Sequence, residues 1–403
     1  MRQNDFGKLR IGVETPIYIL MFVLLAIQIA SPLRIDLLVS LGTRMIFGST
    51  ILAFILSVKL RKNRDVYFLT IILLMIIVVL SMIVSMNLSY KGIVAALSFL
   101  EIPLFMEAYP KINSQNIKKT IYISFTILSI YYNLISFTSL SHIYYTDYGE
   151  RFMDFLSLGY NNPNETAMYL FLCTIILVAF HSEVKNKVAK IFLTIDIILI
   201  VRLIWLTLSR TGLILSSVFI FLVILLQNKK IPNFLRIIAT ALPLIFLILT
   251  IFFNQFLSNW TLFGDTFETG RYDIYIEVIK NLNLIQLFVG DYNYYFKNLH
   301  NAICSIFATT GILGVSIYYW FMISKIRYIH NSILDNKIGK IGLIGILCIY
   351  AYTSTEAAFF ISGGSFAAFV ISIYLLIVSS FHVSEKKDEN LYHENNILSN
   401  TGE

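Results

Sequence analysis

Residues 269–275 have the sequence Thr-Gly-Arg-Tyr-Asp-Ile-Tyr and lie inside a polar, tyrosine-rich segment that spans 254–301. Long apolar runs flank this segment on both sides, and no other connection in the chain is as long. A loop of about 45 residues is usually functional, because idle connections in compact domains are shorter. The segment 254–300 is therefore predicted to carry the functional site.

The composition is typical of a membrane protein. Of the 403 residues, 57% are hydrophobic and 14% are charged, and the mean hydropathy is +0.74, far from the average of soluble domains. The cysteines Cys173, Cys304 and Cys348 lie in or beside apolar runs, which favours packing over a disulfide framework. The net charge of +7 comes from short basic clusters between apolar runs, as membrane topology requires, so nucleic-acid binding is excluded.

Apolar runs long enough to cross a bilayer recur along the chain. A helix needs roughly 20 apolar residues to cross about 30 Å of hydrocarbon. The sequence therefore predicts an all-α polytopic membrane protein with about twelve transmembrane helices, a single transmembrane domain over 1–383 and a polar tail over 384–403. The first run lacks a small-residue cleavage site and is predicted to be an anchor. The predicted spans lie near 15–32, 38–58, 66–86, 92–109, 119–138, 166–182, 191–208, 211–227, 237–256, 301–323, 341–354 and 365–381.

Lysine and arginine are divided unevenly between the two sets of connections. Basic clusters such as 59–64 and 185–190 fall in one set, whereas the other set holds scattered residues such as Arg210. Positively charged loops stay in the cytoplasm. Both termini are therefore predicted to be cytoplasmic and the 254–300 loop extracytoplasmic, and the tail over 384–403 is predicted to be disordered.

Two polar stretches border predicted spans on the side of the long loop. Residues 159–166 have the sequence Gly-Tyr-Asn-Asn-Pro-Asn-Glu-Thr, in which Pro163 suits the first helical position and Glu165 the positive end of the helix dipole. We expect Tyr160 and Asn164 either to contact substrate or to belong only to this start of a helix. Arg210 follows Ser209 at the same interface, where it either meets substrate or extends to lipid headgroups.

Arg202 lies inside a predicted span. An arginine near mid-membrane costs several kcal/mol unless it is paired or wetted, so it is expected to face the bundle interior or a cavity. Glu101 and Asp196 are the candidate partners. Ion pairing is the favoured interpretation, and contact with substrate is the alternative.

Apolar residues at helical spacing over 274–282 predict an amphipathic helix that begins at Gly270 and lies on the membrane surface. Arg271 falls in its first turn, where free N–H groups and a guanidinium fork favour phosphate oxygens. The alternative is an ion pair with Asp265 or Glu268.

The end of the long loop carries further candidates. Tyr292, in a turn over 290–295, offers an aromatic ring that either stacks on a sugar or anchors the loop at the membrane interface. His300 and Asn301 begin the next span. An imidazole can accept a proton near neutral pH, although a structural role for a lone interfacial histidine is the alternative.

These residues together resemble the O-antigen ligase and polymerase family, over roughly residues 155–320. The matching elements, in that family's order, are an Asn162-Pro163-Asn164 element before a span, Ser209-Arg210-Thr211-Gly212 between two spans, a large loop that opens with Gly270-Arg271 and carries Gly290, and His300-Asn301 followed by Thr310-Gly311-Ile312-Leu313-Gly314.

The resemblance implies a GT-C-like membrane glycosyltransferase that uses oligosaccharides carried on undecaprenyl diphosphate outside the bacterial cytoplasmic membrane. In that family's scheme Arg210 and Arg271 grip the diphosphate and His300 is the general base on the acceptor hydroxyl. No cofactor is implied. The outer loops of the sequence contain no Asp-x-Asp motif, and Asp36 stands alone, which argues against a metal-dependent enzyme.

Polymerases and ligases of this family differ in the acceptor. A capsular or exopolysaccharide polymerase is preferred, because the loop is compact and because polymerases diverge widely, as the loosely matched motifs do. A polymerase would work with a flippase and a chain-length regulator. The alternative from another class is a transporter or lipid-linked sugar flippase, which Arg202 and Glu101 inside spans would suit. Transporter folds of this kind usually have two matched halves. The two halves of this sequence differ, because the long loop over 254–300 has no counterpart in the first half.

Overall fold

The computed structural model of the chain describes most of residues 3–381. The gaps within that range are 31–32, 34, 36, 38–40, 42–43, 46–47, 56–65, 111, 113, 138–142, 145–154, 157, 159, 161–162, 256–258, 260, 263–264, 267–269, 298, 334–335 and 357–364. The predicted polar tail lies outside the described residues, as do positions 38–40, 42–43, 46–47 and 56–58 of the predicted span over 38–58. Asp36, Asn162 and Glu268 also lie outside them.

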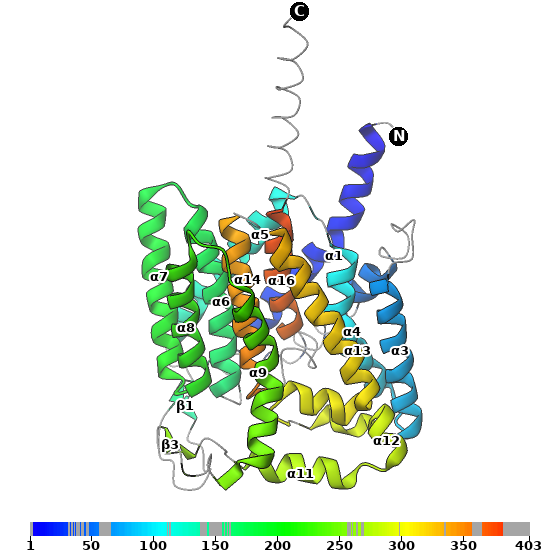
Figure 1. Ribbon diagram of the computed structural model, residues 1–403. Coiled ribbons are helices and arrows are strands. Elements are labelled where there is room, and N and C mark those ends of the chain that lie inside the picture. The colour runs from blue at the N-terminus through cyan, green and yellow to red at the C-terminus, as the bar shows by residue number, and fades with distance from the viewer. Residues whose placement is uncertain are drawn as a thin grey trace, which may run out of the picture.

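Long helices form most of the described chain, which confirms the all-α fold class (Figure 1). The long helices are α1 (Gln3–Ala30), α3 (Val66–Val84), α4 (Tyr90–Ala108), α5 (Gln115–Ser136), α6 (Pro163–Glu183), α7 (Lys187–Leu206), α8 (Arg210–Leu226), α9 (Asn233–Phe252), α13 (Ala302–Ser332), α14 (Lys337–Tyr352) and α16 (Ser365–Ser379). Between α9 and α13 come the short helices α11 (Arg271–Asn281), α12 (Leu284–Val289) and the 3₁₀ turn η1 (Tyr292–Phe296). Two antiparallel pairs of two-residue strands join β1 (Ile143–Tyr144) to β2 (Phe155–Leu156) and β3 (Thr261–Leu262) to β4 (Asp265–Thr266).

Every predicted span other than 38–58 coincides with one long helix. The largest differences are at the ends: α1 starts at Gln3 and α13 continues to Ser332, because hydropathy marks where apolar residues stop and a helix can continue beyond them. In the described chain α3, α6, α9 and α13 are long and apolar enough to span a membrane, and shorter apolar helices accompany them. The chain is thus a membrane protein by length and composition of its helices.

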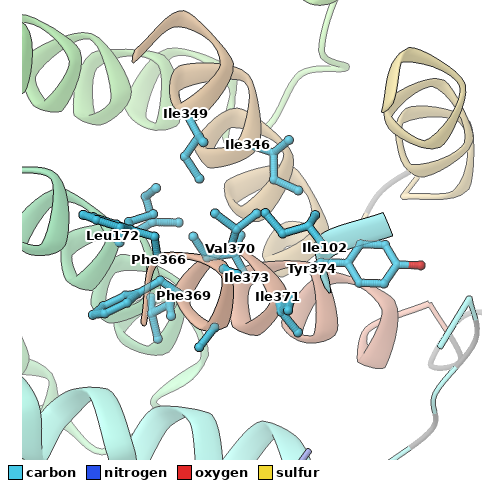
Figure 2. Close-up of a cluster of buried hydrophobic side chains, with 14 of the residues drawn as sticks. Ile102, Leu172, Ile346, Ile349, Phe366, Phe369, Val370, Ile371, Ile373 and Tyr374 are labelled. Carbon is cyan, nitrogen blue, oxygen red and sulfur yellow. The ribbon is translucent and has the colours of Figure 1, made fainter. Parts of the chain in front are cut away.

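Helix α16 forms the centre of the bundle. Every residue from Phe366 to Val378 is buried, as expected for a helix that is apolar on all sides. It packs against α1, α4, α5, α6 and α14. Figure 2 shows Phe366, Phe369 and Val370 of α16 among Leu172 of α6 and Ile346 and Ile349 of α14. The outer helices α7, α8 and α9 instead expose large apolar side chains such as Phe192, Phe221 and Phe252, which suits contact with lipid.

The helices of the long loop lie across one end of the bundle, here termed the loop end, and the start of α1 lies at the opposite end (Figure 1). The short helices confirm the prediction that the loop contains helical segments. Tyr275 and Val278 of α11 and Tyr294 of η1 are buried with Cys304 and Ala308 of α13. The loop is therefore packed onto the bundle by an apolar cluster of its own.

A second contact fastens the loop at a break in α13. Gly311 interrupts the helix with φ 66° and ψ −170°, and Gly290 has φ 83°. A Cβ atom on Gly290 would lie 2.3 Å from the backbone of Thr309, and one on Gly311 would lie 2.3 Å from the carbonyl of Phe288. The two backbones touch directly, which only glycine permits.

Candidate active site

Arg271 is the first residue of α11, as the sequence predicts. Gly270 precedes it with φ 74° and ψ 9°, a left-handed conformation that turns the chain into the helix. The buried side chains of Tyr275 and Val278, on the same face of α11 as Arg271, fix this helix against the bundle. The guanidinium carbon of Arg271 lies 5.8 Å from the ring centre of Phe246 on α9, so the arginine points toward the bundle.

Arg210 is the first residue of α8 and is held by the capping residue before it. Ser209 Oγ accepts a hydrogen bond from the Gly212 N–H at 3.3 Å and donates one to Asn164 Oδ1 at 2.7 Å. A Cβ atom on Gly212 would lie 2.7 Å from Cβ of Ala167. The starts of α6 and α8 are therefore closely packed, and Arg210 lies beside Asn164.

The two arginines meet at one pocket. Arg210 and Arg271 line a pocket of about 60 Å³ with Asn164, Thr211, Ile214, Phe246 and Thr355. Guanidinium groups favour phosphate and carboxylate oxygens, to which they donate paired hydrogen bonds. The volume exceeds the roughly 15 Å³ that one water needs and is well below the about 300 Å³ of a small organic ligand pocket. The pocket fits the phosphate part of a larger ligand.

His300 is connected to this pocket through Glu356. His300 Nδ1 lies 3.7 Å from Glu356 Oε2, and Glu356 Oε1 accepts a hydrogen bond from Asn164 Nδ2 at 2.9 Å. Asn164 also lines the pocket, although His300 is not among the described lining residues. At this distance the buried Glu356 carboxylate attracts a protonated imidazole electrostatically, and His300 retains 30% side-chain exposure at the loop end. The arrangement suits a histidine that exchanges a proton with a ligand.

The backbone of His300 is strained, and Asn301 holds it in place. His300 has φ 52°, a left-handed value that costs roughly 1–2 kcal/mol outside glycine. Asn301 is fully buried and caps α13 by accepting a hydrogen bond from the Cys304 N–H at 3.0 Å. Its Nδ2 donates to the carbonyls of Pro243 at 3.0 Å and Ser354 at 3.1 Å. Asn301 therefore has a structural role, and strain held in this way is a common feature of functional sites.

The tyrosines proposed to meet substrate are buried in the described structure. Tyr292 has no exposed surface, and its hydroxyl donates to the Gly92 carbonyl at 3.1 Å. Burial raises the pKa of the Tyr292 hydroxyl well above its usual value, so it remains a donor. Tyr160 is also buried, and its hydroxyl donates to Gln28, which also accepts from Tyr132 at 2.8 Å. These contacts give both tyrosines a structural role in anchoring segments of the loop end.

Arg202 is not placed as the sequence predicts. It is exposed on the surface of α7, one turn before that helix ends at Leu206, with its guanidinium carbon 5.5 Å from the ring centre of Phe137. Within the described chain it forms no ion pair with Asp196 or with Glu101, which is buried on α4. Because the helix ends so soon after it, the residue is close to the loop end and needs no internal counter-ion.

Comparison with known proteins assigns no family to this chain. No model of a known protein family matches it, and no curated protein matches its sequence. The candidate site therefore rests on its own geometry: two arginines at one pocket, and an asparagine and a glutamate that connect the pocket to a histidine.

Glu356 is the residue that the sequence analysis missed. It follows a predicted span in the sequence Thr-Ser-Thr-Glu over 353–356 and belongs to no recognisable motif. Its burial and its position between His300 and Asn164 depend on the contact of α6 with α14, which lie far apart in the sequence. Glu356 is the one acidic residue between the predicted spans over 341–354 and 365–381, and this is the sequence signal that would have identified it.

Proposed function

We propose that the chain is a membrane glycosyltransferase of the GT-C type that joins oligosaccharide units carried on undecaprenyl diphosphate. The observation that carries the proposal is the pocket shared by Arg210 and Arg271 and its connection through Glu356 to His300. The favoured activity is polymerisation, in which the growing chain is transferred to a new unit. A ligase of the same chemistry would use a foreign acceptor instead.

In the proposed reaction, the acceptor hydroxyl attacks the anomeric carbon of the donor sugar and the bond to the diphosphate breaks. His300 takes the hydroxyl proton, and Glu356 stabilises the imidazolium that forms. Undecaprenyl diphosphate leaves with the bonding electrons, and its new negative charge lies against Arg210 and Arg271. Fixed cations at that place stabilise the transition state more than the ground state.

The proposal includes a membrane arrangement. About twelve helices cross the bacterial cytoplasmic membrane, both termini are cytoplasmic, and the loop end faces the outside, where lipid-linked units become available. The basic cluster over 185–190, between α6 and α7 at the other end of the bundle, supports this orientation (Figure 1). A flippase that delivers the units and a chain-length regulator are the expected protein partners.

The lipid part of the donor would enter the membrane beside α8. Ile214 lines the pocket and is 46% exposed on the apolar surface of α8. A diphosphate bound by Arg210 and Arg271 therefore places its polyprenyl tail in contact with lipid-facing side chains rather than with the bundle interior. This geometry supports a donor carried on a membrane lipid over a soluble sugar nucleotide.

The deciding experiment is to incubate the purified full-length protein with undecaprenyl diphosphate oligosaccharide and separate the products by size. A ladder of multiples of the unit supports the polymerase. Transfer of a single unit to an added foreign acceptor supports the ligase. If the protein in vesicles only moves the lipid-linked unit across the bilayer, the transporter alternative is correct and the proposed function is wrong.

We expect Arg271→Lys to lose nearly as much activity as Arg271→Ala, about 100-fold in rate. Lysine keeps the charge and loses the paired donors that fit two phosphate oxygens. The matched control is Arg236→Lys, in the first turn of α9 at the other end of that helix from Phe246. Rates are measured with the ladder assay. Full activity of Arg271→Lys would count against a role in gripping the diphosphate.

The reaction is expected to proceed without a divalent cation, because the guanidinium groups supply the positive charge that a metal supplies in other enzymes. The rate of ladder formation by purified protein should stay within about twofold after treatment with EDTA. Loss of activity that is restored by Mg²⁺ or Mn²⁺ and by no monovalent salt would contradict this prediction.

A further inference from the structure

A larger cavity lies between α5 and α7. Its volume is about 570 Å³, and none of its lining residues is shared with the Arg210–Arg271 pocket. Apolar side chains form most of its wall, and several of them, such as Leu134, Phe192 and Ile195, also face the outside of the bundle. In a membrane an apolar space of this kind is filled by hydrocarbon rather than by water.

The length of the cavity matches one leaflet. Along α7 its lining extends from Ala189 to Leu199, which corresponds to about 15 Å at about 1.5 Å per residue. The hydrocarbon core of a bilayer is about 30 Å thick, so each leaflet contributes about 15 Å. One acyl chain of a phospholipid fits this length.

Hydrogen bonds between α5 and α7 shape the wall. Asp196 on α7 accepts a hydrogen bond from Ser129 Oγ at 2.6 Å and one from Asn133 Nδ2 at 3.3 Å. Asn133 and Asp196 both line the cavity. These bonds fix the separation of the two helices, so the cavity belongs to the folded bundle.

A cation lies at the rim of the cavity nearest the loop end. Phe137 lines the cavity, and the guanidinium carbon of Arg202 lies 5.5 Å from the centre of its ring. Arg202 is exposed, and no carboxylate of the described residues pairs with it. Trp205, one turn further along α7, is also exposed, and tryptophan is typical of the membrane interface. The rim therefore has the character of the headgroup region.

We propose that the α5–α7 cavity and Arg202 form a binding site for an anionic phospholipid. The phosphate lies on the Arg202 guanidinium, and one acyl chain fills the cavity. A single arginine complements a single phosphate, and the depth of one leaflet is that of a phospholipid chain rather than of a longer polyprenyl tail. The site is independent of the proposed function, because it uses none of the residues of the candidate active site.

Trp205 provides the probe for the test. The chain contains three tryptophans, so Trp260→Phe with Trp320→Phe leaves Trp205 as the single fluorophore beside Arg202. The full-length protein in detergent is titrated with phosphatidylglycerol that carries brominated acyl chains, which quench tryptophan at short range. We expect the quenching to saturate with phosphatidylglycerol. Brominated phosphatidylcholine should need about tenfold higher concentration for the same quenching, because its positively charged choline is repelled by Arg202.

Substitutions separate a built site from ordinary lipid contact. Arg202→Gln is expected to weaken binding of phosphatidylglycerol by about tenfold, and Arg202→Lys by less, because lysine retains the charge. Leu199→Phe, which narrows the cavity, is expected to weaken binding as well. Its matched control is Ile198→Phe, at an exposed residue that does not line the cavity, and this variant should bind as the parent does. Elution as a monodisperse peak shows that each variant is folded.

Two results would overturn the proposal. Quenching that never saturates and is equal for both lipids and all variants would mean that the protein meets only bulk lipid there. Displacement of brominated phosphatidylglycerol by undecaprenyl phosphate at a lower concentration than unlabelled phosphatidylglycerol requires would mean that the cavity takes a polyprenyl chain. Neither result bears on the ladder assay, so failure of this site and failure of the glycosyltransferase proposal are distinguishable.

Discussion

Replacing His300 with alanine is expected to abolish chain extension and leave single lipid-linked units unused. General base catalysis contributes about 100- to 10,000-fold to a rate, and His300 is the described histidine that Glu356 and Asn164 connect to the arginine pocket. The measurement is the ladder assay with purified protein, supported by the length distribution of polymer made in cells. Polymer of normal length from His300→Ala would refute the base assignment.

Two control variants make this result specific. His181→Ala alters a histidine near the end of α6 that is opposite the site and should retain full activity. Glu356→Gln keeps the shape of the group beside His300 Nδ1 and removes its negative charge, which lies 3.7 Å from the imidazole. It should lower the rate less than His300→Ala does and leave the amount of folded protein unchanged. Equal losses would mean that Glu356 has a larger role than stabilising the imidazolium.

The sequence predicts the helices of this protein better than their contacts. Hydropathy locates the long helices because burial in lipid or protein requires apolar runs of about 20 residues. Local chemistry also predicts that α6 begins at Pro163 and that Arg271 lies in the first turn of α11. These features depend only on neighbours in the sequence.

The errors concern residues whose environment depends on distant segments. Tyr292 lies in a turn of interfacial composition, but Ser85, directly after α3, and Gly92, in the first turn of α4, hold it in a buried position. Arg202 lies near the middle of the predicted span over 191–208. The helix runs instead from Lys187 to Leu206, which places Arg202 in its last turns. Glu356 becomes visible as a site residue only when α14 and α6 are brought together. For Tyr292 and Glu356 tertiary contact decides, and sequence spacing carries no information about it. For Arg202 the position of the helix ends decides.

The crossing of the two backbones at Gly290 and Gly311 leads to the largest expected effect on stability, because Gly290 lies against Thr309 and Gly311 against Phe288. Alanine at either position brings a methyl group to 2.3 Å from backbone atoms of the opposite segment, and backbone cannot rotate away as a side chain can. Overpacking of this kind costs about 1–3 kcal/mol, and the left-handed φ values of 83° and 66° add about 1–2 kcal/mol for a residue with a Cβ atom. We expect Gly290→Ala and Gly311→Ala each to destabilise the protein by about 3 kcal/mol.

Gly270→Ala is the control for a positive φ, because Gly270 has φ 74° and no atom lies within 4 Å of an added Cβ. The Gly270→Ala variant should lose about 1 kcal/mol of folding free energy, from the positive φ alone. Thermal unfolding in detergent, followed by the loss of the monodisperse elution peak, compares the three variants. The difference between Gly270→Ala and the other two variants contains the close approach of the two backbones and the added strain at Gly290 and Gly311. Their ψ values of 176° and −170° lie in a region that essentially only glycine adopts, whereas Gly270 has ψ 9°. If Gly311→Ala unfolds at the same temperature as Gly270→Ala, the loop is not fastened to α13 at this crossing, and the apolar cluster around Tyr275 alone holds Arg271 beside Arg210.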